Sequence, residues 1–281
     1  MGIKTKQMLK LRVLVVALFL GFALLLSLSI TAYTKSKYKP LHPRIESQCC
    51  KNPSKLPLPV AKALVHYASS NITPQQTPAE IKITAKVLQN RGPCNMLVFG
   101  LGYDSLMWSA LNHGGKTVFL EEDESWIGKM RSIHPELESH YVQYPTMVTE
   151  AYDLLKYAQS APECAPWQGD LELSSCNKLA LKNLPPHIYG TEWDLIMIDA
   201  PRGYFPEAPG RMQAIYSSAV MALNRQSSGN TDVFVHDVAR TVEDIYSKAF
   251  LCQENLVAAE GKLWHFNIPA KAGAITFCSK Q

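Results

Sequence analysis

Two glycines and a pair of carboxylates, about twenty residues apart, are the first residues in this sequence that could bind one ligand together. The run Val-Phe-Gly-Leu-Gly-Tyr-Asp places Gly100, Gly102 and Asp104 directly after a short apolar stretch. Glycines at a turn between a strand and a helix let the backbone approach a ligand closely. Glu121 and Glu122 follow a second apolar stretch, at the spacing from which an acidic side chain reaches a ribose diol. The pattern predicts a cofactor site, with Glu121 as the ribose ligand and Glu122 as the second candidate.

Polar residues also follow two later apolar stretches of the chain. Asp199 comes directly after residues 194–198, and His236 and Asp237 come directly after residues 232–235. Neighbouring parallel strands would bring these three side chains together beside the cofactor. Asp199 or His236 could then take a proton from a weak hydroxyl nucleophile, and Asp237 could orient His236. The same oxygens suit a divalent metal, so Asp199 and Asp237 are also candidate metal ligands.

A loop rich in Pro and Gly separates these two clusters and carries Arg202, Tyr204 and Arg211. Arginine forks recognise carboxylates, and tyrosine can stack on a sugar face or bond its hydroxyl groups. The three residues are therefore candidate ligands for an acidic sugar. The alternative for Arg211 is that it only begins the next helix, although a cation is unfavourable at that end.

Each of these features also has an ordinary structural explanation. A glycine pair can serve a tight turn, and an Asp at a strand end can cap the following helix, which is our interpretation of Asp123. The ligand-binding interpretation therefore depends on the combination of the four strand ends and not on any one of them.

The elements that must position these residues alternate along the chain from residue 96 onward. Apolar runs predict strands at residues 96–99, 117–120, 140–144, 194–198, 232–235, 263–268 and 274–278. Helical spacing predicts helices at residues 61–69, 77–89, 105–111, 124–132, 149–159, 211–224 and 242–251. Residues 162–186 fit neither pattern and are expected to form a long loop. The fold predicted is α/β, with a Rossmann-like seven-stranded methyltransferase sheet that ends in an antiparallel hairpin.

The first part of the chain differs from the rest in composition. Residues 13–32 are apolar and long enough to cross a bilayer of about 30 Å as a helix, so they predict a transmembrane signal anchor. A cleaved signal peptide is the alternative, although the apolar run is longer than is usual for one. The expected division is a short cytoplasmic tail at 1–12, the anchor at 13–32, a stem at 33–59 and the folded domain at 60–281.

Charge argues against nucleic acid as a partner. The net charge of +4 includes eight basic and no acidic residues before residue 45. The remainder has twenty Lys and Arg against twenty-four Asp and Glu, so the folded part is acidic overall. A basic face for a phosphate backbone is therefore not expected.

Seven cysteines and one glycosylation pattern are compatible with an oxidising compartment. Cys164 with Cys176, and Cys252 with Cys278, are the disulfides that we expect, while Cys94 is expected to be a small buried side chain. Asn71 begins an Asn-Ile-Thr acceptor pattern. These signals favour a lumenal position for the folded domain, although the spacing of the cysteines matches no zinc-binding template.

Several stretches together are more specific than any single motif. They lie at residues 64–67, 71–76, 98–108, 119–123, 193–201, 203–212 and 233–237. In combination they resemble the plant polysaccharide-biosynthesis family that includes glucuronoxylan 4-O-methyltransferases, over residues 61–278. The resemblance implies a single-pass type II membrane protein of the Golgi apparatus with a lumenal catalytic domain. It also implies methyl transfer from S-adenosylmethionine to O4 of glucuronic acid on a cell-wall polysaccharide, and stimulation by a divalent metal.

Departures from the family pattern concern the acceptor. Tyr103 stands where the xylan-directed enzymes usually have His, and Arg202 stands where they have Thr. Residues 204–207 and 262–266 are more similar to the branch that methylates glucuronic acid on arabinogalactan. Both polymers therefore remain candidates, with a slight preference for arabinogalactan. The residues do not predict an oligomeric state.

Two other functions remain open at this level. The first is a non-catalytic scaffold of the same fold that supports xylan biosynthesis, against which the intact Gly100, Gly102, Glu121 and Asp199 argue. The second is a nicotinamide-dependent oxidoreductase, which the missing third glycine of the dinucleotide fingerprint disfavours.

Overall fold

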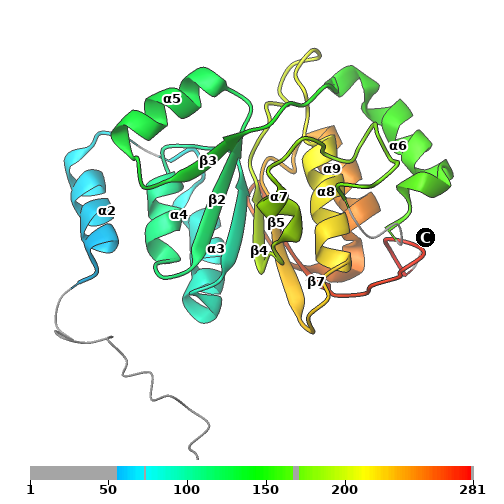
Figure 1. Cartoon of the computed structure of the whole chain (residues 1–281). Coiled ribbons are helices and arrows are strands. Elements are labelled where there is room, and N and C mark those ends of the chain that lie inside the picture. The colour runs from blue at the N-terminus through cyan, green and yellow to red at the C-terminus, as the bar shows by residue number, and fades with distance from the viewer. Residues whose placement is uncertain (1–55, 73, 167–170, 280–281) are drawn as a thin grey trace, which may run out of the picture. The chain divides into compact units, whose positions relative to one another are not determined.

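The computed structural model describes residues 56–72, 74–166 and 171–279, and Figure 1 labels its elements. A seven-stranded sheet forms the centre, in the order β3-β2-β1-β4-β5-β7-β6. The first five strands are parallel, and β7 is antiparallel to both of its neighbours. The strands are β1 (Asn95–Phe99), β2 (Lys116–Glu121), β3 (Glu138–Tyr141), β4 (Leu195–Ile198), β5 (Asn230–Val235), β6 (Leu256–Glu260) and β7 (Leu263–Pro269). The predicted seven-stranded α/β sheet is confirmed.

Helices cover both faces of this sheet. Figure 1 shows α2 to α5 on one side and α6, α8 and α9 on the other. Their bounds are α2 (Leu58–Ser69), α3 (Pro78–Arg91), α4 (Ser105–Leu111), α5 (Glu124–Ile133), α6 (Ala151–Ser160), α7 (Pro186–Gly190), α8 (Met212–Leu223) and α9 (Thr241–Tyr246). Each predicted helix has a counterpart here, but α7 was not predicted.

Strand residues alternate between two separate cores, which explains why the central strands are apolar on both faces beyond their first residues. In β1, Met96 and Val98 pack in the cluster that includes residues of α2 to α5. Leu97 and Phe99 point the other way, into the larger cluster beneath α6 to α9. Because both faces of a parallel strand are covered, polar residues are excluded until the strand ends. Polar side chains that could bind a ligand are therefore expected where these strands end.

The N-terminal helices join the sheet through a capping box. Thr77 Oγ1 accepts a hydrogen bond from the Glu80 N–H at 3.3 Å, and Glu80 Oε2 accepts one from the Thr77 N–H at 2.7 Å. The predicted start of this helix is confirmed. Glu80 Oε1 also accepts the Lys262 N–H at 2.6 Å. The cap of α3 therefore anchors the turn between β6 and β7.

The final hairpin lies earlier in the chain than we predicted. It pairs β6 with β7 across Gly261 and Lys262, and residues 274–278 form no strand. The prediction failed because β6 is mostly exposed and lacks a clear apolar face. Residues 274–278 are apolar for a different reason, since Cys278 and Phe277 pack beneath α9 and its continuation, Ser247–Leu251.

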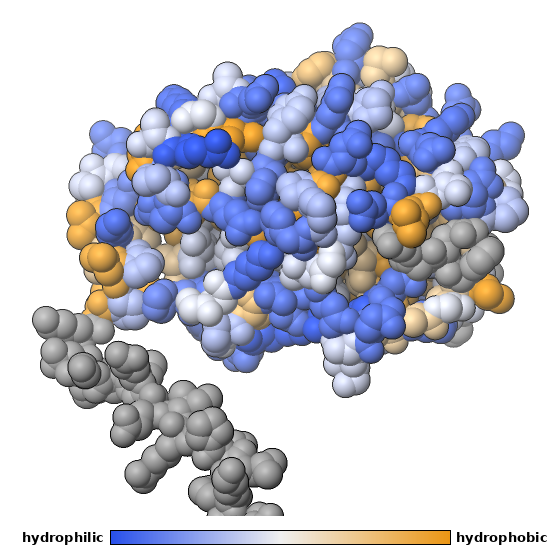
Figure 2. All heavy atoms as spheres, viewed as in Figure 1, coloured by the Kyte–Doolittle hydropathy of each residue, from blue (hydrophilic) through white to orange (hydrophobic). Residues whose placement is uncertain are grey.

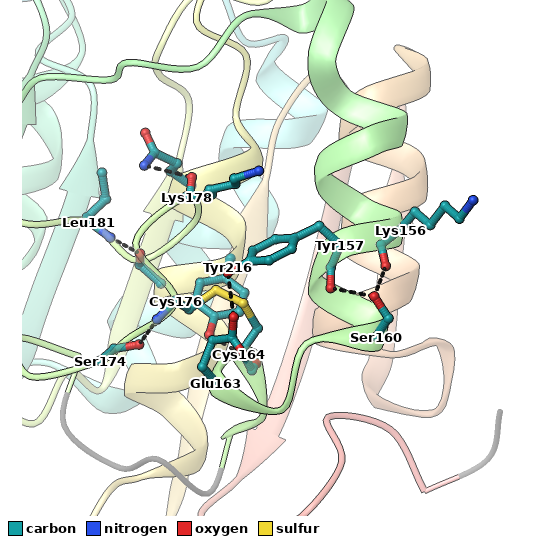
Figure 3. Close-up of a disulfide and its surroundings, with 12 residues drawn as sticks. Lys156, Tyr157, Ser160, Glu163, Cys164, Ser174, Cys176, Lys178, Leu181 and Tyr216 are labelled. Atoms are coloured by element: carbon teal, nitrogen blue, oxygen red, sulfur yellow. Dashed lines mark hydrogen bonds between the residues drawn. A yellow bond between two sulfur atoms is a disulfide. The ribbon is translucent and has the colours of Figure 1, made fainter.

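Two disulfides tie the irregular segments to this framework. Cys164 is bonded to Cys176 and Cys252 to Cys278, while Cys94 is a buried free thiol, so all three predictions are confirmed. The first disulfide lies beside α8, where the Tyr216 hydroxyl donates to the Cys164 carbonyl at 3.0 Å (Figure 3). This disulfide and the Tyr216 hydrogen bond therefore attach the long loop predicted at 162–186 to the core.

The predicted anchor at 13–32, the tail and the stem lie outside the described residues. Within the described part of the chain, no helix combines the length and apolar character needed to span a bilayer. The exposed apolar side chains include Leu58, Leu64 and Val65 on α2, and Figure 2 shows apolar residues gathered over that helix.

Removing the disulfide that closes the longer loop should lower stability more than removing the other. Chain-entropy reasoning assigns about 2–4 kcal/mol to a disulfide, and the contribution grows with the loop that it closes. The two loops separate their cysteines by 26 and 12 residues. We expect Cys252→Ala/Cys278→Ala to lower the free energy of unfolding in urea more than Cys164→Ala/Cys176→Ala does. Equal or inverted losses would show that native packing, not loop closure, sets the effect.

Candidate active site

The turn after β1 forms the floor of the site. Gly100 has a φ of 117°, which L side chains rarely adopt, and a Cβ there would lie 3.3 Å from the Ala200 Cβ. A Cβ on Gly102 would lie 2.6 Å from Asp104 Oδ1. Gly100 is therefore required by its backbone conformation, whereas a side chain at Gly102 would have to displace the Asp104 carboxylate.

Glu121 ends β2 and joins the turns that follow β1 and β2. It is 9% exposed, and its two carboxylate oxygens accept the N–H groups of Leu101 at 2.9 Å and Asp123 at 3.0 Å. Burial raises the pKa of Glu121, and these hydrogen bonds oppose the shift only in part. Each oxygen keeps a second lone pair for a ligand such as a ribose hydroxyl.

The next two acidic residues have other contacts. Glu122 Oε1 accepts both the backbone N–H and the Nε–H of Arg202, each at 2.9 Å, so it holds the loop after β4. Asp123 caps α5 by accepting the Trp126 N–H at 3.1 Å. The interpretation of Asp123 as a helix cap is confirmed.

Asp199 is the centre of a hydrogen-bonded array at the end of β4. Its Oδ1 lies 2.9 Å from His236 Nδ1 and 3.1 Å from Arg211 Nη2. Its Oδ2 accepts only the Gln76 amide, at 3.2 Å. Burial alone would raise the pKa of Asp199, but the hydrogen bond from His236 and the charge of Arg211 outweigh it and hold this pKa below its usual value.

His236 is hydrogen-bonded to Asp199 but, unlike Asp199, does not line the cavity at this edge of the sheet. Burial lowers the pKa of His236, but the hydrogen bond and charge of Asp199 more than reverse this, so the pKa is raised. Its second ring nitrogen, Nε2, lies 3.7 Å from Glu80 Oε2. A ring between two carboxylates is stabilised as imidazolium, which fits a positioning role for His236 better than the predicted role of general base.

Arg211 is nearly enclosed and has most of its donors engaged. Its guanidinium donates to the carbonyls of Pro201, Asp199 and His236, to Asp199 Oδ1 and to Asp237 Oδ2 at 3.0 Å. Little donor capacity remains for the carboxylate of an acceptor. These contacts fit a positioning role for Arg211 better than the predicted role of substrate ligand, and its place at the start of α8 is as expected.

A metal ion at this array is not supported by the arrangement. The ligand atoms of Asp199, His236 and Asp237 lie within 4.8 Å of one another, as a metal site requires. However, Arg211 Nη2 lies 3.1 Å from Asp199 Oδ1 and 3.0 Å from Asp237 Oδ2, so a guanidinium supplies the positive charge between them. The predicted metal at Asp199 and Asp237 does not fit these contacts.

A cavity of about 410 Å³ opens at this edge of the sheet. All the predicted site residues line it except His236; they are Gly100, Gly102, Asp104, Glu121, Glu122, Asp199, Arg202, Tyr204, Arg211 and Asp237. The geometry therefore brings together residues from four strand ends, as the pattern predicted. Their individual chemical roles stay predictions.

Sequence reasoning missed four residues that shape this site. Gln76 holds Asp199, Trp126 lines the cavity, and Arg240 lies 2.9 Å from Asp237 and 5.9 Å from the Tyr204 ring. Glu243 is fully buried, 3.8 Å from both Arg211 and Arg240. Arg240 could have been found as a polar residue in the loop after β5. Gln76 and Glu243 gave no such signal, because they reach the site only through tertiary packing.

The fold and the site together define a class of protein. A sheet in this strand order, with a glycine turn after its first strand and a carboxylate after its second, is the Rossmann-like methyltransferase fold. The chain belongs to the IRX15/IRX15L/GXM family, whose sequence model matches residues 79–266.

Curated relatives from Arabidopsis thaliana are similar over most of their length. Glucuronoxylan 4-O-methyltransferase 1 is 49% identical over 95% of this chain and 94% of its own. Arabinogalactan O-methyltransferase 2 is 53% identical over 75% of this chain and 73% of its own. Protein IRREGULAR XYLEM 15 is 44% identical over 76% of this chain and 67% of its own.

The ionised carboxylate of Asp104 at the cavity should lower the free energy of unfolding. Burial and the nearby charge of Asp199 raise the pKa of Asp104 from 3.8 to about 6. Because the folded pKa is the higher one, the contribution of Asp104 to stability falls as pH rises from about 4 to about 6. Asp104→Asn removes this loss and keeps an acceptor for Trp108 Nε1, now bonded at 2.8 Å.

The Asn variant should therefore gain on wild type across that window, by as much as about 3 kcal/mol above pH 6. Urea unfolding at pH 4 and pH 7.5 measures the difference. A gain that is the same at both pH values would contradict the assignment of the raised pKa to Asp104.

Proposed function

We propose that this protein transfers a methyl group from S-adenosylmethionine to O4 of glucuronic acid on a cell-wall polysaccharide, either arabinogalactan or glucuronoxylan. The observation that carries the proposal is the cavity in which the glycine turn, Glu121 and Asp199 share one space. Relatives of 49–53% identity named for this chemistry support it. Neither polymer is favoured by identity, because both groups of relatives are similarly close.

The methyl donor fits the residues at the glycine turn. When bound, S-adenosylmethionine supplies an electrophilic methyl group on a sulfonium. Gly100 and Gly102 leave room for its close approach, and Glu121 keeps lone pairs for the ribose hydroxyls. Asp104 and Asp199 present negative charge to a cationic ligand, and Trp126 offers an aromatic surface at the same cavity.

Asp199 is positioned to take the acceptor proton. A sugar hydroxyl is a weak nucleophile, so transfer depends on alignment and on an acceptor for the proton as the new C–O bond forms. Oδ1 of Asp199 already accepts two hydrogen bonds, whereas Oδ2 accepts only that of Gln76. The free lone pair of Oδ2 is therefore the site that receives the hydroxyl proton. Arg211 and His236 hold the Asp199 carboxylate in place. Because the pKa of Asp199 is lowered, the carboxylate accepts the hydroxyl proton only late in the reaction.

The acceptor is bound at the loop after β4. Arg202 and Tyr204 line the cavity from this loop, and Arg240 joins them from the loop after β5. The Arg202 side chain is 53% exposed and uses Nε for Glu122, which leaves its terminal nitrogens for a carboxylate. Tyr204 is exposed and suited to stack on a sugar ring.

We place the protein in the Golgi membrane, anchored through residues 13–32 with the folded domain in the lumen. Two disulfides among the described residues support an oxidising compartment. The alternative is a non-catalytic scaffold of the same fold, and the two relatives not named as methyltransferases, Protein IRX15-LIKE and Protein IRREGULAR XYLEM 15, are less similar, at 43% and 44% identity. Calorimetry with S-adenosylmethionine distinguishes the two, because a scaffold need not bind it.

Asp199→Asn should abolish most turnover without preventing cofactor binding. The amide keeps the shape but cannot take a proton, so we expect kcat to fall by about 10²- to 10⁴-fold. Calorimetric binding of S-adenosylhomocysteine should change little. Asp153→Asn, an exposed position on α6, is the matched control and should behave as wild type. Full activity in Asp199→Asn would remove Asp199 from the mechanism.

Arg202→Ala should weaken recognition of the acceptor carboxylate. Loss of a charge-assisted hydrogen bond costs about 1.5–3 kcal/mol, which corresponds to a rise of about tenfold or more in the KM for the polymer. A carboxyl-reduced acceptor, in which glucose replaces glucuronic acid, should be used equally by wild type and variant. If the variant discriminates between the two acceptors as strongly as wild type does, Arg202 does not contact the carboxylate.

A further inference from the structure

A second cluster of ligand-type side chains lies at the edge of the sheet and takes no part in the cavity. It consists of Glu138 and His140 on β3 and His187 on α7. Nε2 of His187 lies 2.8 Å and Nε2 of His140 lies 3.2 Å from the same oxygen, Glu138 Oε1. Two imidazoles therefore converge on one carboxylate oxygen.

The fold itself produces this convergence. Glu138 and His140 are two residues apart on a strand, so both point to one face of the sheet. Their ladder partners on β2, Val118 and Leu120, are buried on the face that α7 and α8 cover. Because β3 is an edge strand, the side chains of Glu138 and His140 extend beyond the core, and His187 lies beside them. Side-chain exposures of 42%, 29% and 40% for Glu138, His140 and His187 leave the cluster open to an ion.

The spacing suits a transition metal. In a tetrahedral zinc site with bonds of about 2.0–2.2 Å, neighbouring ligand atoms lie about 3.4 Å apart. The observed separations of 2.8 and 3.2 Å are close to this value, and all three ligand atoms lie within 4.8 Å of one another. Two imidazoles with one carboxylate favour zinc over magnesium or calcium, which prefer sets of oxygen ligands.

We propose that Glu138, His140 and His187 form a zinc site on the outer edge of the sheet, with one position left to solvent. Lys116 opposes a cation, although its ammonium group contacts Thr191 and Trp193. The ion joins the edge strand to α7 and so stabilises the fold without entering the reaction.

Titration calorimetry of the untagged full-length protein with zinc chloride, after treatment with a chelator, tests this site. We expect one equivalent to bind wild type, and binding to weaken by more than about tenfold in His187→Ala. His113→Ala, which removes another exposed histidine, should bind as wild type does. Zinc should also raise the Tm of wild type and of His113→Ala, but not that of His187→Ala.

Two results would overturn the proposal. One is the absence of zinc binding to wild type. The other is binding that survives in His187→Ala but is lost in His66→Ala, since His66 and His134 form a second close histidine pair among the described residues, with ring centres 4.9 Å apart. Glu138→Gln, which preserves side-chain size, guards against misfolding of the histidine variant. It should retain methyl-transfer activity and bind zinc at least tenfold more weakly, and zinc binding equal to wild type in this folded variant would likewise count against the site.

Discussion

The geometry of the cavity depends on one buried guanidinium, that of Arg211. It joins three carbonyl groups and two carboxylates from the loops after β4 and β5, with only 3% of the residue exposed. Glu243 Oε1 lies 3.8 Å from the Arg211 Nε, and burial raises the pKa of this carboxyl group. Without this cation, the carboxylates of Asp199, Asp237 and Glu243 would be left close together with too little compensating charge, which is strongly destabilising in a protein interior.

The same interaction sets the chemistry of the site. Because Arg211 and His236 both stabilise the ionised form of Asp199, its carboxylate stays charged in the cavity. A low pKa makes it a weak base, so its contribution is to hold an oriented lone pair and a negative charge beside the methyl donor. In the proposed reaction the proton becomes acidic only as the C–O bond forms, and a weak base is then sufficient. The pKa of Asp104 is raised first by burial and then by the charge of Asp199, which shows the cost of enclosing several carboxylates in one cavity.

Much of this arrangement could be predicted from the sequence, for identifiable reasons. Parallel strands covered on both faces are mostly apolar runs, so the sequence predicts β1, β2, β4 and β5. The residues that follow these runs, Gly100, Glu121, Asp199 and His236, are then the candidates for the site. Edge elements carry weaker patterns, which is why β6 was missed and residues 274–278 were mistaken for a strand. The positions of Gln76 and Glu243 depend on how helices pack onto the sheet, and the pattern of one chain does not encode those contacts. The sequence predicts Arg211 as a site residue, but it does not show that the guanidinium uses its donors within the protein instead of binding a ligand.

The most direct test is to incubate the full-length protein with labelled S-adenosylmethionine and, separately, with purified glucuronoxylan and arabinogalactan, followed by linkage analysis. A cavity built as described should place label on O4 of glucuronic acid in one polymer or both. Label on neither polymer, under conditions in which calorimetry shows that the protein binds the donor, would mean that the array around Asp199 serves another purpose than methyl transfer to this sugar.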